Sequence, residues 1–180
     1  LAERLSPDQG TVKVTDDVKI VIFDQNREQL DQEETLKRAL APAGDTVIYR
    51  GRSIHVISWA KRFLFEPDQL ELPIKQLSGG EQARILIARL MLRPADILLL
   101  DEPTNDLDIP SLEVLEDSLR DFPGAIVLVS HDRFLLDGLA DTVLALDGEK
   151  TTGFYADYDQ WISAQKRIKD LTKTGDKKSK

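Results

Sequence analysis

Two segments of this chain bring together residue types that suit phosphate chemistry. Residues 77–82 read LSGGEQ and place a serine and two glycines at the start of an apolar helical pattern. Residues 97–108 read ILLLDEPTNDLD and run from a short aliphatic strand directly into the acidic pair Asp101 and Glu102. Because two linked motifs rarely coincide, their order and short spacing predict a phosphate-binding surface together with a magnesium and general-base cluster.

The first segment has the pattern of a capped helix that can also bind an anion. Ser78 can cap a helix that begins near Gly80, and Glu81 completes a capping box three residues after the serine. Taken alone, the pattern fits a purely structural cap equally well. Gly79 and Gly80 favour the anion site, because without side chains they let a ligand approach the N–H groups at the positive end of the helix.

The second segment predicts a strand that delivers acidic side chains to a sheet edge. Open α/β sheets bind ligands at the carboxyl ends of their strands. At that position Asp101 can hold a hydrated Mg²⁺, and Glu102 can polarise an attacking water. The alternative is a strand that simply leaves the core through polar residues, and the LSGGEQ segment upstream argues against it.

Two further polar residues follow predicted strands. His131 comes after the strand predicted at residues 125–129, so we expect it at the same sheet edge as Glu102, where it would contact the terminal phosphate and orient the water. Gln25 follows the strand predicted at residues 19–23, and its amide could ligate Mg²⁺ or the attacking water. By itself, Gln25 is only a polar residue in a polar loop.

The first half of the chain predicts a β-hairpin followed by helices. The predicted elements are strands at residues 11–14 and 19–23 and helices at residues 29–40 and 53–65. His55 would lie in the middle of the second helix and is assigned a structural role. We therefore expect a small helical subdomain at about residues 28–93.

After Pro94 the pattern changes to alternating strands and helices. Buried strands are predicted at residues 97–100 and 125–129, helices at residues 110–119 and 133–139, and closing strands at residues 142–146 and 151–154. Wholly apolar strands of this kind are typical of a parallel sheet covered by helices on both faces. The fold class is therefore an α/β sandwich built on a largely parallel sheet.

These motifs resemble those of the ATP-binding cassette (ABC) ATPases. The matching parts are the signature motif at residues 77–82, the Walker B strand at 97–102, the D-loop at 105–108, the switch histidine His131 and the Q-loop glutamine Gln25. A narrower resemblance is to the ABC-F subfamily, in particular the second cassette of its Uup-type members. It lies in residues 77–84 (LSGGEQAR), 103–108 (PTNDLD), 130–135 (SHDRFL) and 154–161 (FYADYDQW). The resemblance covers nearly the whole chain.

The resemblance implies a P-loop NTPase-like cassette that binds ATP and Mg²⁺. Asp101 and Gln25 would hold Mg²⁺, Glu102 would activate water, and His131 would sense the γ-phosphate. The remaining ATP-binding residues implied by the motifs are Ser78, Gly79, Gly80 and Asp108, of which the serine and glycines would serve the site of the facing cassette.

The resemblance also implies partners. A second cassette in the same parent chain would complete each ATP site, and ATP-driven closure would change the grip on a ribosome, RNA or DNA in the cytoplasm, without a membrane subunit. Two alternatives stay open: the ATPase subunit of an ABC membrane transporter, and an interaction domain that does not hydrolyse ATP.

One part of the family pattern is missing from this sequence. A P-loop needs Gly-Lys followed by Ser or Thr, and none of the ten glycines precedes a lysine. The only methionine is Met91, and the chain opens on what reads as the end of a helix. We therefore expect residues 1–165 to be the C-terminal part of a nucleotide-binding domain that lacks Walker A and is inactive alone, followed by a basic linker at residues 166–180.

Composition limits the remaining possibilities. The net charge is −8, but residues 166–180 carry seven basic and two acidic side chains, so the rest of the chain carries −13. An acidic body does not suit a general nucleic-acid surface. The basic segment could contact phosphates or be a flexible, solvated connector. There is no cysteine for a disulfide framework, and the longest aliphatic run, residues 125–129, is too short to span a bilayer.

Overall fold

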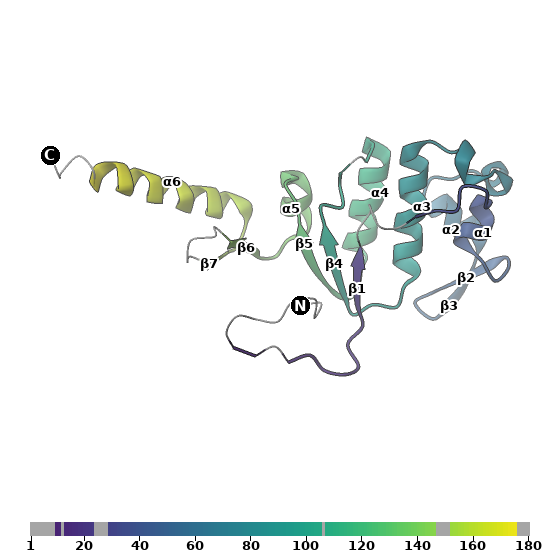
Figure 1. Cartoon of the computed structure of the whole chain (residues 1–180), viewed down its shortest axis with the longest axis horizontal. Coiled ribbons are helices and arrows are strands. Elements are labelled where there is room, and N and C mark those ends of the chain that lie inside the picture. Colours follow the sequence, from purple (N-terminus) through teal and green to yellow (C-terminus); the bar gives the residue numbers. More distant parts are fainter. Residues whose placement is uncertain (1–9, 12, 24–28, 106, 147–151, 176–180) are drawn as a thin grey trace. The chain divides into compact units, whose positions relative to one another are not determined.

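The computed structural model describes residues 10–11, 13–23, 29–105, 107–146 and 152–175 (Figure 1). The chain divides into two compact units, Leu1–Ser130 and His131–Lys180. The first unit contains a parallel sheet, two long helices and a set of short helices and strands in the region predicted to be a helical subdomain. The second contains an antiparallel strand pair between two helices.

A three-stranded parallel sheet lies in the first unit. Its strand order is β1 (Ile20–Phe23), β4 (Ile97–Asp101), β5 (Ala125–Val129), so that β4 is the central strand. Phe23 pairs with Leu100, and Asp101 pairs with Val129. All three strands therefore end at one edge, as the α/β prediction requires.

Helices α3 (Gly79–Leu92) and α4 (Ile109–Arg120) run side by side (Figure 1). Helix α3 buries most of its length, which agrees with its nearly continuous run of apolar residues. Helix α4 buries one face, formed by Val114, Leu115 and Leu119, as its apolar spacing predicts. The two helices belong to different stretches of the sequence, so their contact brings the LSGGEQ segment beside the residues that follow β4.

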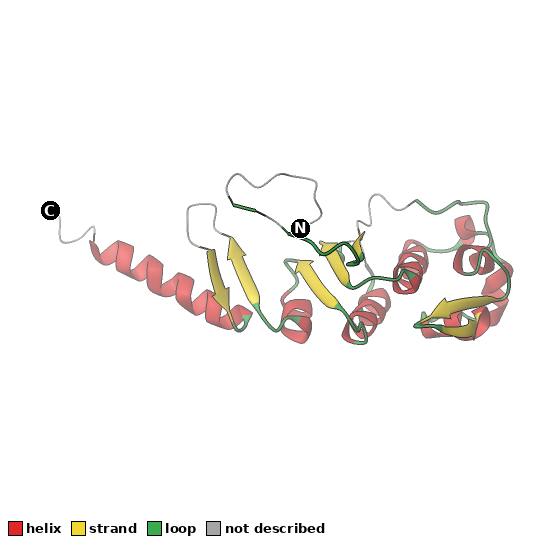
Figure 2. Cartoon of the chain, turned by 90° about the horizontal axis from the view of Figure 1, so that it is seen from below, coloured by secondary structure: helices red, strands yellow, loops and turns green. Residues whose placement is uncertain are grey.

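The helical subdomain also contains strands. Its elements are α1 (Leu36–Leu40), β2 (Thr46–Tyr49), β3 (Arg52–His55), α2 (Val56–Arg62) and the short 3₁₀ helices η1 (Pro67–Glu71) and η2 (Ile74–Gln76). Trp59, Phe63 and Phe65 are almost fully buried in it. Figure 2 shows the β2–β3 ribbon as two yellow arrows among the red helices at the right of the view.

The predicted helices at residues 29–40 and 53–65 are wrong in part. In the first range only Leu36–Leu40 is helical. The second range begins inside strand β3 (Arg52–His55), which pairs with β2 in an antiparallel hairpin. Arg50 and Gly51 both have positive φ, 51° and 73°, which is the two-residue turn that closes tight hairpins. His55 consequently ends β3 and caps α2, accepting a hydrogen bond from the N–H of Ile57 at 3.2 Å.

Two strand predictions also need correction. Among the described residues of the range 11–23 the predicted hairpin does not form, because β1 instead pairs in parallel with β4 and residues 13–14 are not in a strand. Strand β5 is not fully buried: Val127 is 41% exposed and Val129 is 56% exposed. One face of β5 is thus open in the described part of the first unit, whereas a strand covered on both faces was expected from its composition.

The second unit comprises α5 (Arg133–Leu139), β6 (Val143–Leu146), β7 (Thr152–Tyr155) and α6 (Tyr158–Gly175). The guanidinium of Arg133 lies over the ring of Tyr158, with its Cζ 4.9 Å from the ring centroid. The Tyr158 ring in turn meets Trp161 edge-on, with centroids 5.1 Å apart.

Helix α6 extends further than the sequence suggests. Residues 166–175 continue it, so this part of the basic segment is helical rather than a flexible connector. The stretch contains no proline, has no glycine before Gly175 and includes three Lys, one Arg and one Leu, which favour helices. Within the described residues, no helix has the length and apolar character needed to cross a membrane.

Candidate functional site

The start of α3 carries the predicted capping box. The Ser78 hydroxyl accepts from the N–H of Glu81 at 3.2 Å, and the Ser78 N–H donates to Oε2 of Glu81 at 2.8 Å. The hydroxyl also donates to the same Oε2 at 2.8 Å. This reciprocal pair fixes where α3 begins, so the direction of its first N–H groups is set by local sequence.

The carboxylate of Glu81 is held in its ionised form. Partial burial alone would raise the pKa of Glu81, but hydrogen bonds from Ser78 and Gln69, together with the nearby Arg84 charge, hold the pKa below its ordinary value. The Gln69 Nε2 donates to Oε1 of Glu81 at 2.6 Å. The cap thus joins α3 to η1 as well as to its own first turn.

The two glycines have different surroundings. A Cβ at Gly79 would meet nothing within 4 Å, so the helix start is open there. A Cβ at Gly80 would lie 2.6 Å from Cγ of Asp108, so glycine is needed for contact with that carboxylate. Within the described residues, no protein acceptor binds the N–H groups of Gly79 and Gly80. The open start of α3 can therefore accept an anion, as unpaired N–H groups at a helix start do.

Asp108 lies beside this helix start as the N-cap of α4. Its Oδ1 accepts from the N–H of Ser111 at 2.9 Å. The adjacent Ser111, through its side chain and its N–H, and then the Arg84 charge lower the pKa of Asp108. The predicted signature residues and the predicted D-loop aspartate are therefore neighbours in the folded first unit.

Asp101 and Glu102 end the central strand. Asp101 is exposed at the carboxyl end of β4, and Glu102 is half-buried directly after it. The φ of Glu102 is +46°, a left-handed conformation that costs a residue with a side chain about 1–2 kcal/mol. The Glu102 N–H donates to the carbonyl oxygen of Val129 at 2.8 Å, which ties this turn to the end of β5. Strain of this kind is common at functional sites.

The structure says less about the two remaining predicted residues, His131 and Gln25. His131 opens the second unit, directly after Ser130 closes the first, and its predicted role toward the phosphate stays a prediction. Gln25 lies outside the described residues. Its predicted role as a ligand of Mg²⁺ also stays a prediction.

The side chains present fit a nucleotide-bound magnesium ion better than a protein-only metal site. Among the described residues, no group of three or more His, Cys, Asp or Glu side chains could hold a metal. In nucleotide sites Mg²⁺ keeps several waters and is bound by one or two carboxylates plus phosphates. The exposed Asp101 carboxylate suits that arrangement.

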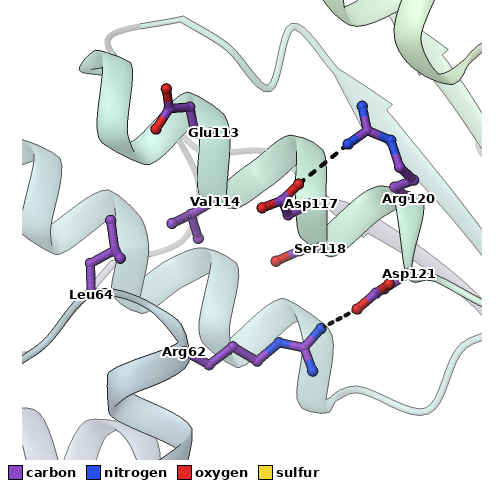
Figure 3. Close-up of a pocket in the computed structure, with 8 residues that line it drawn as sticks. All are labelled: Arg62, Leu64, Glu113, Val114, Asp117, Ser118, Arg120 and Asp121. Atoms are coloured by element: carbon purple, nitrogen blue, oxygen red, sulfur yellow. Dashed lines mark hydrogen bonds and ion pairs between the residues drawn. The ribbon is translucent and has the colours of Figure 1, made fainter.

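A separate hollow lies between the end of α2 and α4. Its volume is about 590 Å³. In Figure 3, Arg62 reaches Asp121 (2.7 Å) and Arg120 reaches Asp117 (3.3 Å), so the charged groups that line it are largely paired with one another. None of the residues predicted at the phosphate site lines this hollow.

Two residues that sequence reasoning missed connect the site. Arg84 is 8% exposed and Ser111 is fully buried, and they contact each other across α3 and α4. Arg84 ends the string at residues 77–84 that resembles the ABC-F subfamily, and it is a single arginine within the apolar run of residues 83–88, but no role was assigned to it from the sequence. Ser111 gives no signal, because serine is common in the first turn of a helix.

Comparison with known families decides the class of this chain. A family model described as ABC transporter matches residues 1–105. The chain belongs to the ABC transporter family. Its α/β architecture is thus that of an ATP-binding cassette.

Curated relatives refine this assignment. The chain is 45% identical to the ATP-binding protein Uup of Caulobacter vibrioides, over 83% of this chain and 25% of that protein. It is 34% identical to the energy-dependent translational throttle protein EttA of Haemophilus influenzae, over 89% of this chain and 30% of that protein. Both are ABC-F proteins, so the predicted subfamily is confirmed. The chain spans about a quarter of the length of the curated Uup relatives.

Solved structures support the fold. A chain from the complex of an archaeal ribosomal stalk protein with an archaeal ribosome recycling factor matches with a TM-score of 0.58 and 25% identity, over 83% of this chain and 29% of that one. A dimeric ATP-binding cassette in a post-hydrolysis state, bound to ADP and phosphate, matches with a TM-score of 0.52 over 72% of this chain and 59% of that one. At 24% identity, the second match bears on the fold alone.

Proposed function

We propose that this cassette hydrolyses ATP as one half of a paired-cassette ABC-F protein, and that ATP-driven closure of the pair acts on the ribosome. The observation that carries the proposal is the position of Asp101 and Glu102 at the carboxyl end of the central strand β4. That edge is where open α/β sheets bind their ligands.

Each acidic residue has a distinct task in this proposal. Asp101, exposed at the strand end, would hold Mg²⁺ together with Gln25. Held by these two side chains, the ion would supply positive charge that offsets the charge on the phosphoryl group. Glu102 would accept the proton of the attacking water, and its backbone bond to Val129 would keep the carboxylate from moving away. His131 would orient that water against the γ-phosphate.

The start of α3 would serve the nucleotide of the facing cassette. Gly79 leaves the helix start open, and the N–H groups of Gly79 and Gly80 can donate to phosphate oxygens. The Ser78 hydroxyl and the Glu81 carboxylate keep this helix start in one geometry. Asp108, packed against Gly80, would lie at the border of the same surface.

The choice of the ribosome over DNA rests on relatives. One is named a translational throttle protein, and one solved neighbour includes a ribosome recycling factor. The basic residues of 166–180 would add phosphate contacts, whereas the acidic remainder of the chain is unsuited to general nucleic-acid binding.

The test is co-sedimentation of the full-length protein that contains this chain with ribosomes, in ATP, in ADP and without nucleotide. We expect binding that requires ATP and is released on hydrolysis. Equal retention on ribosomes in all three conditions, tight binding to duplex DNA instead, or co-purification with an integral membrane permease would contradict the ribosome assignment.

A further inference from the structure

A buried arginine lies where α3, α4 and the segment after α2 meet. The Arg84 guanidinium lies over the ring of Phe65, with its Cζ 5.3 Å from the ring centroid. Its Nε donates to the carbonyl oxygen of Phe63 at 3.1 Å. Because a buried charge is tolerated only where its donors are satisfied, these contacts fix the guanidinium in place.

The other side of this guanidinium faces the first turn of α4. Arg84 Nη1 donates to Oγ of Ser111 at 3.4 Å and lies 3.9 Å from Oδ2 of Asp108. The Ser111 hydroxyl donates to the carbonyl oxygen of Gly80 at 3.0 Å, and the Ser111 N–H donates to Oδ1 of Asp108. One connected set of polar contacts therefore joins the first turn of α3 to the first turn of α4.

The same two helix starts also touch directly. The Asp108 carboxylate occupies the space into which a Gly80 side chain would project. The position of Asp108 is consequently limited on one side by Gly80 and on the other by Ser111 and Arg84. A change at either polar residue would free the carboxylate to move relative to α3.

We propose that Arg84 and Ser111 are positioning residues that keep the Ser78–Gly80 helix start and Asp108 in one fixed arrangement toward the nucleotide of the facing cassette. Neither residue touches that nucleotide. The inference rests on the proposed function, because it assigns both helix starts to the same ATP.

The chemistry of arginine explains why this position needs more than a positive charge. Separate nitrogens of the planar guanidinium serve Phe63 and Ser111 at the same time. A lysine at position 84 offers one compact charged group on a flexible stem and cannot reproduce that fork. A small misplacement of groups that bind the reacting phosphate is costly, since productive geometry contributes much of the rate.

The test compares variants of the full-length protein that contains this chain. The variants are Arg84→Ala, Arg84→Lys, Ser111→Ala and the double variant Arg84→Ala/Ser111→Ala, with Arg89→Ala as the control from the same helix. Two readouts are taken: kcat and KM for ATP, and hydrogen exchange of residues 78–82 and 108–112. Melting temperatures give the folded fraction of each variant.

We expect the KM for ATP to rise about ten-fold in Arg84→Ala, because the Ser78–Gly80 helix start would no longer be held in line with the phosphate, and a weakening of one such charge-assisted contact corresponds to about a factor of ten. Ser111→Ala should show a smaller rise, and Arg84→Lys should recover only part of the loss. The double variant should resemble Arg84→Ala alone, because residues of one network are not additive. Exchange should rise in both segments together, and Arg89→Ala should change neither readout.

Several results would overturn the inference. One is a KM and exchange pattern in Arg84→Ala that match those of Arg89→Ala. A second is a loss in kcat, with KM unchanged, that is proportional to the loss of folded protein. A third is faster hydrogen exchange throughout the chain. Either would mean that Arg84 only stabilises the fold. Should Arg84→Ala fail to fold, Ser111→Ala and Arg84→Lys decide by the same criteria. If the wild-type protein does not hydrolyse ATP, the proposed function is wrong, and the exchange of the two segments alone decides this inference.

Discussion

Two adjacent glycines at the start of α3 do different work. Gly79 leaves the helix start open to an anion, whereas Gly80 allows α4 to approach through Asp108. Glu102 must adopt a left-handed backbone conformation, which places an acidic side chain at a sharp turn after β4. The candidate site therefore depends on the close packing of α4 against Gly80 and on the backbone conformation of Glu102 more than on the number of charged groups.

The difference between the glycines can be measured. Gly80→Ala forces a methyl group against the Asp108 carboxylate, so we expect the free energy of unfolding of the full-length protein to fall by about 1–3 kcal/mol. Gly79→Ala is the matched control, because its added methyl group meets open space and should change stability by less than about 0.5 kcal/mol. Denaturant titration of both variants measures this. Equal losses of stability would show that the Gly80–Asp108 contact is not tight.

Some of these residues could be predicted from sequence and some could not. The cap formed by Ser78 and Glu81 depends on residues three apart, so a local pattern is enough to predict it. The contacts of Arg84 with Phe63 and Ser111 join residues 21 and 27 positions apart, and no local pattern encodes them. The sequence therefore predicted the chemical groups of the site, while the residues that hold them together required the fold.

Among the secondary-structure elements, helix α3 positions most of the candidate site. Its capping box sets its first turn, and its buried apolar length packs it among α1, α4 and the β2–β3 hairpin. The hairpin was missed because its strands are only four residues each, too short for their periodicity to distinguish a strand from a helix. The positive φ values of Arg50 and Gly51 decide between the two.

The cap of α3 predicts a pH dependence. The pKa of Glu81 is lower in the folded protein than its ordinary value, so the ionised carboxylate stabilises the folded state at neutral pH. That contribution is present above the unfolded-state pKa of about 4.3 and is lost as pH falls through the lower, folded-state pKa. In Glu81→Gln the cap keeps its shape but does not ionise.

Denaturant titration of wild type and Glu81→Gln between pH 7 and pH 3 checks this prediction. We expect wild type to be the more stable at pH 7 and the difference to shrink as the pH falls. A stability difference that is constant over this range, or that grows in acid, would mean that the ionised carboxylate does not stabilise α3.

For the whole molecule, charge is distributed unevenly between the acidic body and the basic segment 166–180. Residues 166–175 of that segment belong to helix α6. The helicity of residues 166–175 could not be predicted from their charge, because runs of charged residues are typical of both linkers and exposed helices.

This charge distribution predicts salt-dependent binding. Replacing the seven basic residues of 166–180 by glutamine keeps helix-forming side chains but removes the charge. We expect the affinity of the full-length protein for ribosomes to fall and its dependence on salt concentration to become shallower, because fewer counterions are released. The control replaces the same number of surface lysines and arginines in residues 13–93. Unchanged affinity and salt dependence would make the segment a solvated connector.

Steady-state ATP hydrolysis by the full-length Glu102→Gln variant measures whether Glu102 is the general base of an ATPase. The matched control is Glu113→Gln, the same change at an exposed position of α4. We predict that Glu102→Gln still binds ATP but hydrolyses it about 10²–10⁴-fold more slowly, while Glu113→Gln keeps wild-type turnover. Wild-type turnover in Glu102→Gln would contradict the account.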